Sequence, residues 1–245
     1  MYKNYIFDLY GTLVDINTNE SKPYLWKKIV EMYAYYGAFY TPAEFKKAYL
    51  RLCKKYTDEV IIKKETKYPE IQLEYVFMDL FTEKGMEVSM EKVRVIGLTF
   101  RSMSTKLLCL YDGVIDLLDS IHAAGRKAYL LSNAQEMFTK HEMIALGIFD
   151  KFDGIVFSSD EGLCKPEERF FRTVIDRYNL NIKESIMIGN DPYTDVLGAN
   201  SVGMDSLYIH SDISPKIPDL TGADIPATYK IMNGDFTKVK ELVLK

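Results

Sequence analysis

The stretch Tyr5-Ile6-Phe7-Asp8-Leu9-Tyr10-Gly11-Thr12-Leu13-Val14 decides the fold of this chain. Its first apolar residues predict a short buried strand, and the carboxylate of Asp8 follows where that strand ends. The Gly-Thr pair beyond it indicates a turn. An aspartate in this place can simply bond to the backbone of its own turn. It can also be a reactive group, because open parallel sheets bind their ligands at the carboxyl ends of their strands.

Further apolar segments predict the other strands of a sheet. They lie at 127–131, 154–157, 186–188, 207–209 and, more weakly, 228–232. Helical patterns separate most of these segments; for example, the apolar residues of 114–121 recur at i, i+3, i+4 and i+7. Strands that alternate with helices predict parallel pairing, and therefore an α/β fold with a doubly wound parallel sheet.

The long stretch between the first and second predicted strands is helical by pattern. Helical spacing covers 23–36, 70–84 and 90–107, and Thr41-Pro42-Ala43-Glu44 is a capping box with proline at the first helical position. The sequence thus predicts an α/β core formed by residues 1–15 and 107–245 and an inserted helical domain formed by residues 16–106.

Polar residues follow the later strands of the predicted core as well. Ser132 and Asn133 follow the second strand, Lys165 lies in the loop after the third, and Asp191 and Asp195 follow the fourth. Because the carboxyl ends of parallel strands meet at one edge of a sheet, these side chains are expected to gather near Asp8.

Each of these residues also has a structural explanation. Ser132 and Asn133 are frequent helix caps and could cap a helix that begins near Ala134. A Lys-Pro pair such as that at Lys165 is typical of a solvated loop. Asp191, which precedes a proline, suits the N-cap of a helix and needs no metal.

The four polar sites together resemble the four motifs of the haloacid dehalogenase superfamily, and the helical insertion resembles its cap domain. The resemblance implies that Asp8 is the nucleophile and that the Ser132-Asn133 segment binds a substrate oxygen. It also implies that Lys165 offsets the carboxylates and binds the transferred phosphoryl group. A carboxylate nucleophile would form a covalent intermediate and divide one difficult step into two easier ones.

The acidic residues predict a magnesium site. If Asp8, Asp191 and Asp195 converge, each like-charge pair at about 4 Å costs several kcal/mol at an effective dielectric constant of about 20. A hard divalent cation such as Mg²⁺ relieves this repulsion. The resemblance implies that the ligands are Asp8, the Tyr10 carbonyl and Asp191, with Asp195 as a further acid. The fourth motif usually places an acid where this chain has Asn190, so either Asn190 or Asp191 can be the ligand.

Tyr10 separates two chemistries. Most phosphatases of the superfamily carry a second aspartate at this position, which acts as general acid and base, whereas true dehalogenases carry tyrosine. A phenol with a pKa of about 10 can donate a proton but is a poor base at neutral pH. A halide leaves without a proton, which explains why a dehalogenase tolerates tyrosine. Alternatively, Tyr10 merely packs beneath the cap.

Three functions follow from these observations. The leading hypothesis is a Mg²⁺-dependent phosphatase or phosphotransferase that acts on a small phosphorylated metabolite through an aspartyl phosphate. The second is a metal-independent 2-haloacid dehalogenase, in which Arg51 could bind the substrate carboxylate. The third is a non-catalytic member that binds a phosphorylated ligand.

Composition limits the setting in which the chain works. The net charge of −4 argues against nucleic-acid binding. No apolar run approaches the roughly 18 residues of a membrane span, and no signal peptide is evident. Three widely spaced cysteines suit a reducing compartment better than a disulfide framework. We therefore expect a cytoplasmic protein without a membrane or nucleic-acid partner.

Overall fold

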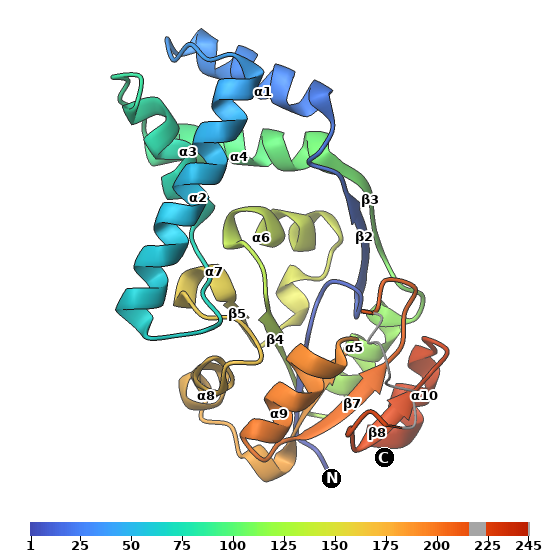
Figure 1. Cartoon of the computed structure of the whole chain (residues 1–245). Helices are drawn as coiled ribbons and strands as arrows, with labels where there is room; N and C mark the ends of the chain where they lie inside the picture. The colour runs from blue at the N-terminus through green and yellow to red at the C-terminus, as the bar shows by residue number, and fades with distance from the viewer. Residues whose placement is uncertain (216–223, 245) are drawn as a thin grey trace.

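A six-stranded parallel sheet forms the centre of the molecule (Figure 1). The computed structural model describes residues 1–215 and 224–244. The strand order is β5-β4-β1-β6-β7-β8, with bounds Gly154–Phe157, Lys127–Ser132, Asn4–Phe7, Ser185–Gly189, Asp205–Ile209 and Tyr229–Ile231. This confirms the predicted α/β fold and its parallel sheet. The chain leaves β1 toward β4 on one side and later returns to β6 on the other, which creates a crevice at the carboxyl end of β1.

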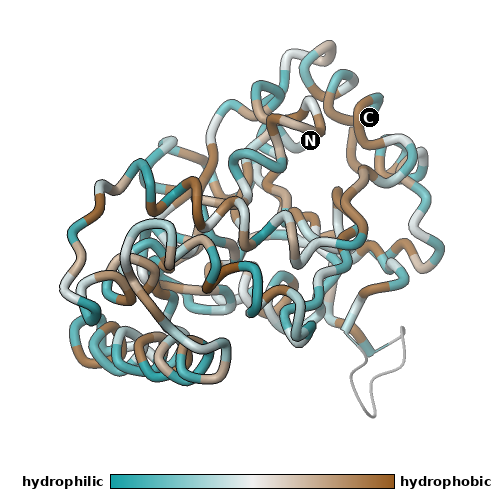
Figure 2. Tube along the Cα trace, turned by 90° about the horizontal axis from the view of Figure 1, so that it is seen from above, coloured by the Kyte–Doolittle hydropathy of each residue, from teal (hydrophilic) through white to brown (hydrophobic). Residues whose placement is uncertain are grey.

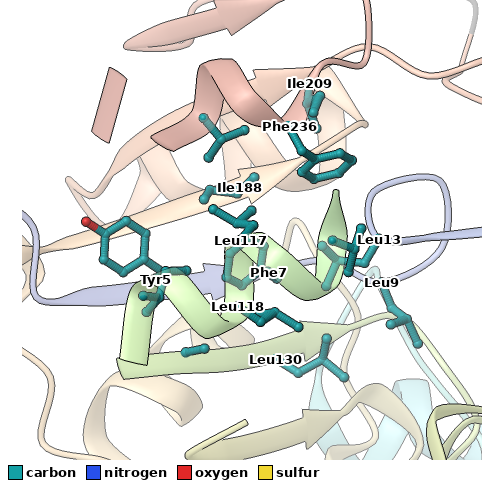
Figure 3. Close-up of a cluster of buried hydrophobic side chains, with 14 of the residues drawn as sticks. Tyr5, Phe7, Leu9, Leu13, Leu117, Leu118, Leu130, Ile188, Ile209 and Phe236 are labelled. Atoms are coloured by element: carbon teal, nitrogen blue, oxygen red, sulfur yellow. The ribbon is translucent and has the colours of Figure 1, made fainter. Parts of the chain in front are cut away.

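The residues of β1 alternate between two apolar layers. Tyr5 and Phe7 lie in a cluster on one face of the sheet, and Ile6 lies in a second cluster on the other face. Figure 3 shows the first cluster, in which side chains from β1, β4 and β6 meet helices α5 (Val114–Ala123) and α10 (Phe236–Val243). All three β1 side chains are fully buried, and each contributes about 1.5–3 kcal/mol through that burial. This two-sided burial explains why β1 reads as an unbroken apolar run.

Helix α8 (Glu168–Arg177) contributes Phe170 and Phe171 to the cluster on the opposite face. The remaining core helices are α6 (Glu136–Ala145) and the short α7 (Ser158–Glu161) and α9 (Gly198–Ser201). Two 3-10 turns, Phe149–Lys151 and Ile182–Glu184, and a π-helical turn, Pro192–Leu197, complete the core. The π-helical turn directly follows β6, so it begins at the ligand-binding edge of the sheet.

Four helices form a separate layer above the sheet, and we call them the cap (Figure 1). They are α1 (Pro23–Tyr35), α2 (Pro42–Lys64), α3 (Leu73–Thr82) and α4 (Met90–Ser104). They share an aromatic-rich cluster of buried side chains, to which α6 adds Met137 and Phe138. The predicted capping box at the start of α2 is confirmed, because Thr41 and Glu44 bond reciprocally. The division of the chain into two domains remains a proposal.

The last helix predicted for the cap is too long at its C-terminal end. The sequence predicts a helix over 90–107, but α4 ends at Ser104 and Thr105–Leu110 forms β3. This strand pairs antiparallel with β2 (Val14–Thr18), a second strand that the sequence analysis missed. The polar residues of β2 give it no strong apolar pattern, and the apolar residues at the start of β3 also continue the helical spacing of α4. Together the two strands connect the core to the cap.

A glycine allows the cap to approach the core closely. A Cβ atom on Gly97 of α4 would lie 2.0 Å from the terminal methyl of Met137 on α6. The terminal methyl of Met137 therefore occupies the space that a side chain at position 97 would take. Figure 2 shows apolar and polar residues interspersed along the chain, with the N and C termini near one another. Within the described residues, we find no helix with both the length and the apolar character needed to span a membrane.

Candidate active site

A cavity of about 220 Å³ opens at the carboxyl edge of the central strands. Its wall contains every residue that the sequence analysis proposed for the phosphatase site: Asp8, Tyr10, Ser132, Asn133, Lys165, Asp191 and Asp195. Asn190, Thr194, Ile213 and Pro215 complete the lining. Residues far apart in sequence thus meet at one place, and among the described residues the lining comes from the core alone.

Lys165 lies between two carboxylates at the base of this cavity. Its Nζ donates to Asp8 Oδ1 at 2.6 Å and to Asp195 Oδ1 at 2.6 Å. Only 3% of Lys165 is exposed, so the solvated-loop interpretation of this residue is wrong. Burial lowers the pKa of Lys165, but the two carboxylates outweigh this effect and raise it overall. The ammonium therefore stays charged and balances the acids beside the proposed nucleophile.

Asp195 is buried and uses both oxygens within the protein. Its Oδ1 accepts from Lys165, and its Oδ2 accepts from the backbone N–H of Asp191 at 3.0 Å. Burial raises the pKa of Asp195, and Lys165 opposes this shift. Asp195 thus holds Lys165 and the start of the π-helical turn in place.

Asp191 is the N-cap of the π-helical turn, as its structural explanation predicted. Its Oδ1 accepts from the backbone N–H groups of Tyr193 at 2.8 Å and Thr194 at 3.2 Å. Asp191 also lines the cavity, so this cap does not remove it from the set of candidate ligands.

Thr12 contacts Asp8 from the turn after β1, a role that the sequence analysis missed. Its hydroxyl lies 3.2 Å from Asp8 Oδ2 and 3.2 Å from Asn190 Oδ1, and it can donate to either. The neighbouring Gly11 has a φ of +80°, and a Cβ there would lie 2.2 Å from Asn190 Nδ2. Only glycine fits this turn without strain. The Gly-Thr pair was visible in the sequence, but its contact with Asn190 was not.

Ser132 and Asn133 do not cap the helix that follows them, because α6 begins at Glu136 and has no side-chain cap. Asn133 instead joins two loops: its Oδ1 accepts from the backbone N–H of Lys165 at 2.8 Å, and its Nδ2 donates to the Lys165 carbonyl at 3.1 Å. The Ser132 hydroxyl is buried beside the cavity and has no hydrogen-bond partner among the described residues. A buried polar group of this kind is normally satisfied, so Ser132 can bind a ligand oxygen.

Tyr10 directs its phenol oxygen toward α6 and the cap. The hydroxyl donates to the Glu142 carboxylate and lies 2.9 Å from the Thr139 hydroxyl. Arg101 of α4 lies 3.4 Å from the same oxygen. Burial raises the pKa of Tyr10, and the charge of Glu142 adds to this shift, so the phenol stays protonated at neutral pH and gives up its proton less readily than an exposed tyrosine. The structure therefore favours the packing role of Tyr10 beneath the cap.

The chemistry of the cavity suits a hard cation, because its candidate ligands are oxygen atoms. The described residues nevertheless contain no group of three His, Cys, Asp or Glu side chains close enough to hold a metal ion by themselves. Asp8 and Asp191 are the acids best placed to bind one, since they are more exposed to the cavity than Asp195, which is almost fully buried. Neutral oxygens and water would have to complete the set.

Arg51, which the dehalogenase hypothesis needs, does not contribute to the cavity lining. It forms an ion pair with Glu83, just beyond α3 in the cap. The described lining also contains no arginine that could bind a substrate carboxylate.

Comparison with known proteins assigns the family. The sequence pattern of haloacid dehalogenase-like hydrolases matches residues 2–203, and the chain therefore belongs to this family of hydrolases. A glyceraldehyde 3-phosphate phosphatase from Pyrococcus abyssi is 23% identical over 85% of this chain and 81% of its own length. Another phosphatase of that name, from Methanothermobacter thermautotrophicus, is 28% identical, but the match spans only 51% of this chain and 56% of the relative.

Solved structures show the same fold. A dehalogenase aligns over 100% of this chain and 98% of its own, with a TM-score of 0.59 and 16% identity. The hydrolase YfnB from Bacillus subtilis, solved bound to magnesium, aligns over 100% of this chain and 99% of its own, with a TM-score of 0.56 and 18% identity. At these identities the likeness concerns the fold alone.

Proposed function

We propose that this hydrolase is a Mg²⁺-dependent phosphatase that acts on a small phosphorylated metabolite through an aspartyl phosphate. The observation that carries the proposal is the bridge of Lys165 between Asp8 and Asp195 at the wall of the cavity. A fixed cation beside a carboxylate nucleophile suits the transfer of a dianionic phosphoryl group. The names of the phosphatase relatives support the same substrate class.

In the first step an Asp8 oxygen attacks phosphorus, and the bond from phosphorus to the leaving oxygen breaks. Lys165 binds charge on the transferred group, and the free Ser132 hydroxyl donates to one of its oxygens. In the second step water attacks the aspartyl phosphate, which releases phosphate and restores the Asp8 carboxylate. Two moderate barriers replace one high barrier.

Magnesium would be held by Asp8, Asp191 and the Tyr10 carbonyl, with Asp195 as the further acid of the proposed set. When bound, Mg²⁺ supplies positive charge that neutralises the phosphoryl oxygens. Asp195 accepts hydrogen bonds from Lys165 and from the backbone N–H of Asp191, and these contacts favour a supporting role over direct binding of the metal. We also propose that the protein works in the cytoplasm, which its three free cysteines suit.

The two alternatives have less support. Dehalogenation is favoured by Tyr10 and by the fold shared with a dehalogenase, but Arg51 is engaged elsewhere. A purely binding role is favoured by the absence of an aspartate at position 10. The names of the phosphatase relatives favour neither alternative.

The first prediction tests the proposed function directly. Purified protein should hydrolyse p-nitrophenyl phosphate with Mg²⁺ and lose that activity in excess chelator. The Asp8→Asn variant should lose at least about 10³-fold in kcat, because an amide is no substitute for the nucleophile. Released phosphate and p-nitrophenol are both measured.

Halide release from 2-chloropropionate in chelator would instead support the dehalogenase. Phosphatase turnover that persists in Asp8→Asn, or that ignores the chelator, would contradict the proposal. Tight binding of a phosphorylated ligand without any turnover would support the binding role.

A further inference from the structure

A buried ion pair between the cap and the core contacts the residue two positions after the proposed nucleophile. Arg101 of α4 donates from Nε to Glu142 Oε1 at 2.6 Å, and its Nη2 lies 3.3 Å from Glu142 Oε2. The side chains are only 16% and 10% exposed. The same carboxylate accepts the phenol hydroxyl of Tyr10. We call Tyr10, Arg101 and Glu142 the Tyr10 cluster.

The arginine also packs against aromatic rings. Its guanidinium carbon lies 5.7 Å from the ring centre of Tyr10 and 5.5 Å from that of Phe138. Arg101 thus contacts the ring of Tyr10 directly, and it holds the Tyr10 hydroxyl through Glu142. A two-pronged guanidinium contact of this kind fixes orientation better than a lysine would.

Tyr10 belongs to the tight turn that carries Asp8. Within this turn the N–H of Gly11 donates to the Val14 carbonyl at 2.8 Å, and the N–H of Leu13 donates to the Leu9 carbonyl at 2.7 Å. A side chain fixed at position 10 therefore restrains the whole turn, including the backbone carbonyl of Tyr10.

We propose that Arg101 and Glu142 are positioning residues: they fix Tyr10, and with it the turn that aims Asp8, to helix α4 of the cap. This inference extends the proposed phosphatase function and rests on it for its kinetic consequences. Neither residue lines the cavity, so neither is a catalytic residue. Their effect on the reaction passes through the turn. Misplacement of reacting groups by about 1 Å can cost about 10²-fold in rate, so a looser turn must slow the reaction.

The chain offers a matched control on the same two helices. Arg94 of α4 forms an ion pair with Glu136 of α6 at 3.0 Å. This pair also joins the cap to α6, but the described contacts include none between it and Tyr10. A loss that reflects only weaker docking of α4 on α6 should therefore appear in both pairs, whereas a loss of positioning should appear in the Tyr10 cluster alone.

The experiment compares Glu142→Gln and Arg101→Met with the control Glu136→Gln. We expect the first two variants to lower kcat about tenfold or more with KM changed less than about threefold, because only the alignment of Asp8 suffers. Arg101→Lys should recover part of the loss, since it keeps the charge but not the forked contact. The control should match the wild type.

Hydrogen–deuterium exchange of the peptide covering residues 8–14 provides a readout that needs no activity. We expect faster exchange in Glu142→Gln and Arg101→Met, and unchanged exchange in Glu136→Gln. If the wild type lacks phosphatase activity but these exchange differences appear, the positioning role stands and the proposed function fails. If the wild type is active and the variants match it in both kcat and exchange, or the control changes equally, the positioning role is overturned.

Discussion

Tyr10 has a structural role, but it leaves position 10 without a general acid for the proposed reaction. Its hydroxyl is directed to Glu142 and Thr139, and its pKa is raised by burial. Position 10 therefore carries no aspartate that could protonate a departing alkoxide. The proposed phosphatase should therefore depend on substrates whose leaving oxygen needs little protonation.

The positioning experiment above is the second prediction, and this dependence on the leaving group is the third. The kcat/KM for aryl phosphates should exceed that for alkyl phosphates by about 10²–10⁴-fold, the usual contribution of general acid catalysis. Tyr10→Asp should narrow this ratio, because the new carboxyl group can protonate a departing alkoxide, even though the variant also gives up the contact with Glu142. A series of phosphate esters that differ in leaving-group pKa provides the measurement. Equal rates across the series would show that another group supplies the proton.

The elements of the core could be predicted because each carries its own local signal. Strand β1 contains the apolar run that begins with Tyr5, and the start of α2 at Thr41 has both partners of a capping box within four residues. The ribbon of β2 and β3 could not be predicted, because β2 has no apolar run and its partner strand lies far along the chain, with Val14 opposite Leu110. Local patterns predict local structure, and this pairing is remote in sequence.

The same distinction holds for the site: some of its features could be predicted from the sequence, and others could not. Asp8, Lys165 and Asp195 could be placed at strand ends from the sequence, and the structure gathers them at one cavity. The contact of Tyr10 with Glu142 could not be predicted, since nothing near either residue indicates the other. Such a contact depends on how the cap packs on α6.

The fourth prediction concerns the start of helix α2. Thr41→Ala removes the hydroxyl that accepts from the Glu44 N–H, and the loss of such a cap costs about 1 kcal/mol in the free energy of unfolding. Thr99→Ala in the interior of α4 is the matched control. It removes a hydroxyl bonded to the Val95 carbonyl but introduces a better helix former, so stability should hold or rise. Urea denaturation measures both, and equal losses would contradict the capping role.

At the scale of the whole molecule, the cap contacts the core at a second place besides α6. The segment 65–72 between α2 and α3 carries Glu70, whose carboxylate accepts from Ser158 at 3.1 Å and from Gln135 at 2.9 Å. The Thr66 hydroxyl donates to Glu167 at 2.7 Å. Gln135 and Glu167 lie two residues beyond Asn133 and Lys165. This segment therefore contacts the loops that carry the second and third of the four polar sites.

The fifth prediction uses the stability of the whole chain to locate the metal. Mg²⁺ at about 100 times its dissociation constant should stabilise the native state by about 2.7 kcal/mol, because it binds the folded site. The melting temperature should rise accordingly in the wild type and in Asn190→Ala, but much less in Asp191→Asn. The reverse pattern would make Asn190 the ligand. An equal rise in both variants would exclude both side chains.

The ribbon that joins the two layers has an evolutionary consequence. Thr18 and Thr105 are partners across β2 and β3, so the polypeptide departs for the four helices and comes back at neighbouring points. An inserted segment whose two ends are adjacent can be lengthened, shortened or exchanged for an unrelated segment, while the strands of the parent sheet keep their connections. Related proteins could thus acquire new substrate preferences through the replacement of one contiguous block of coding sequence, the block that encodes the four helices.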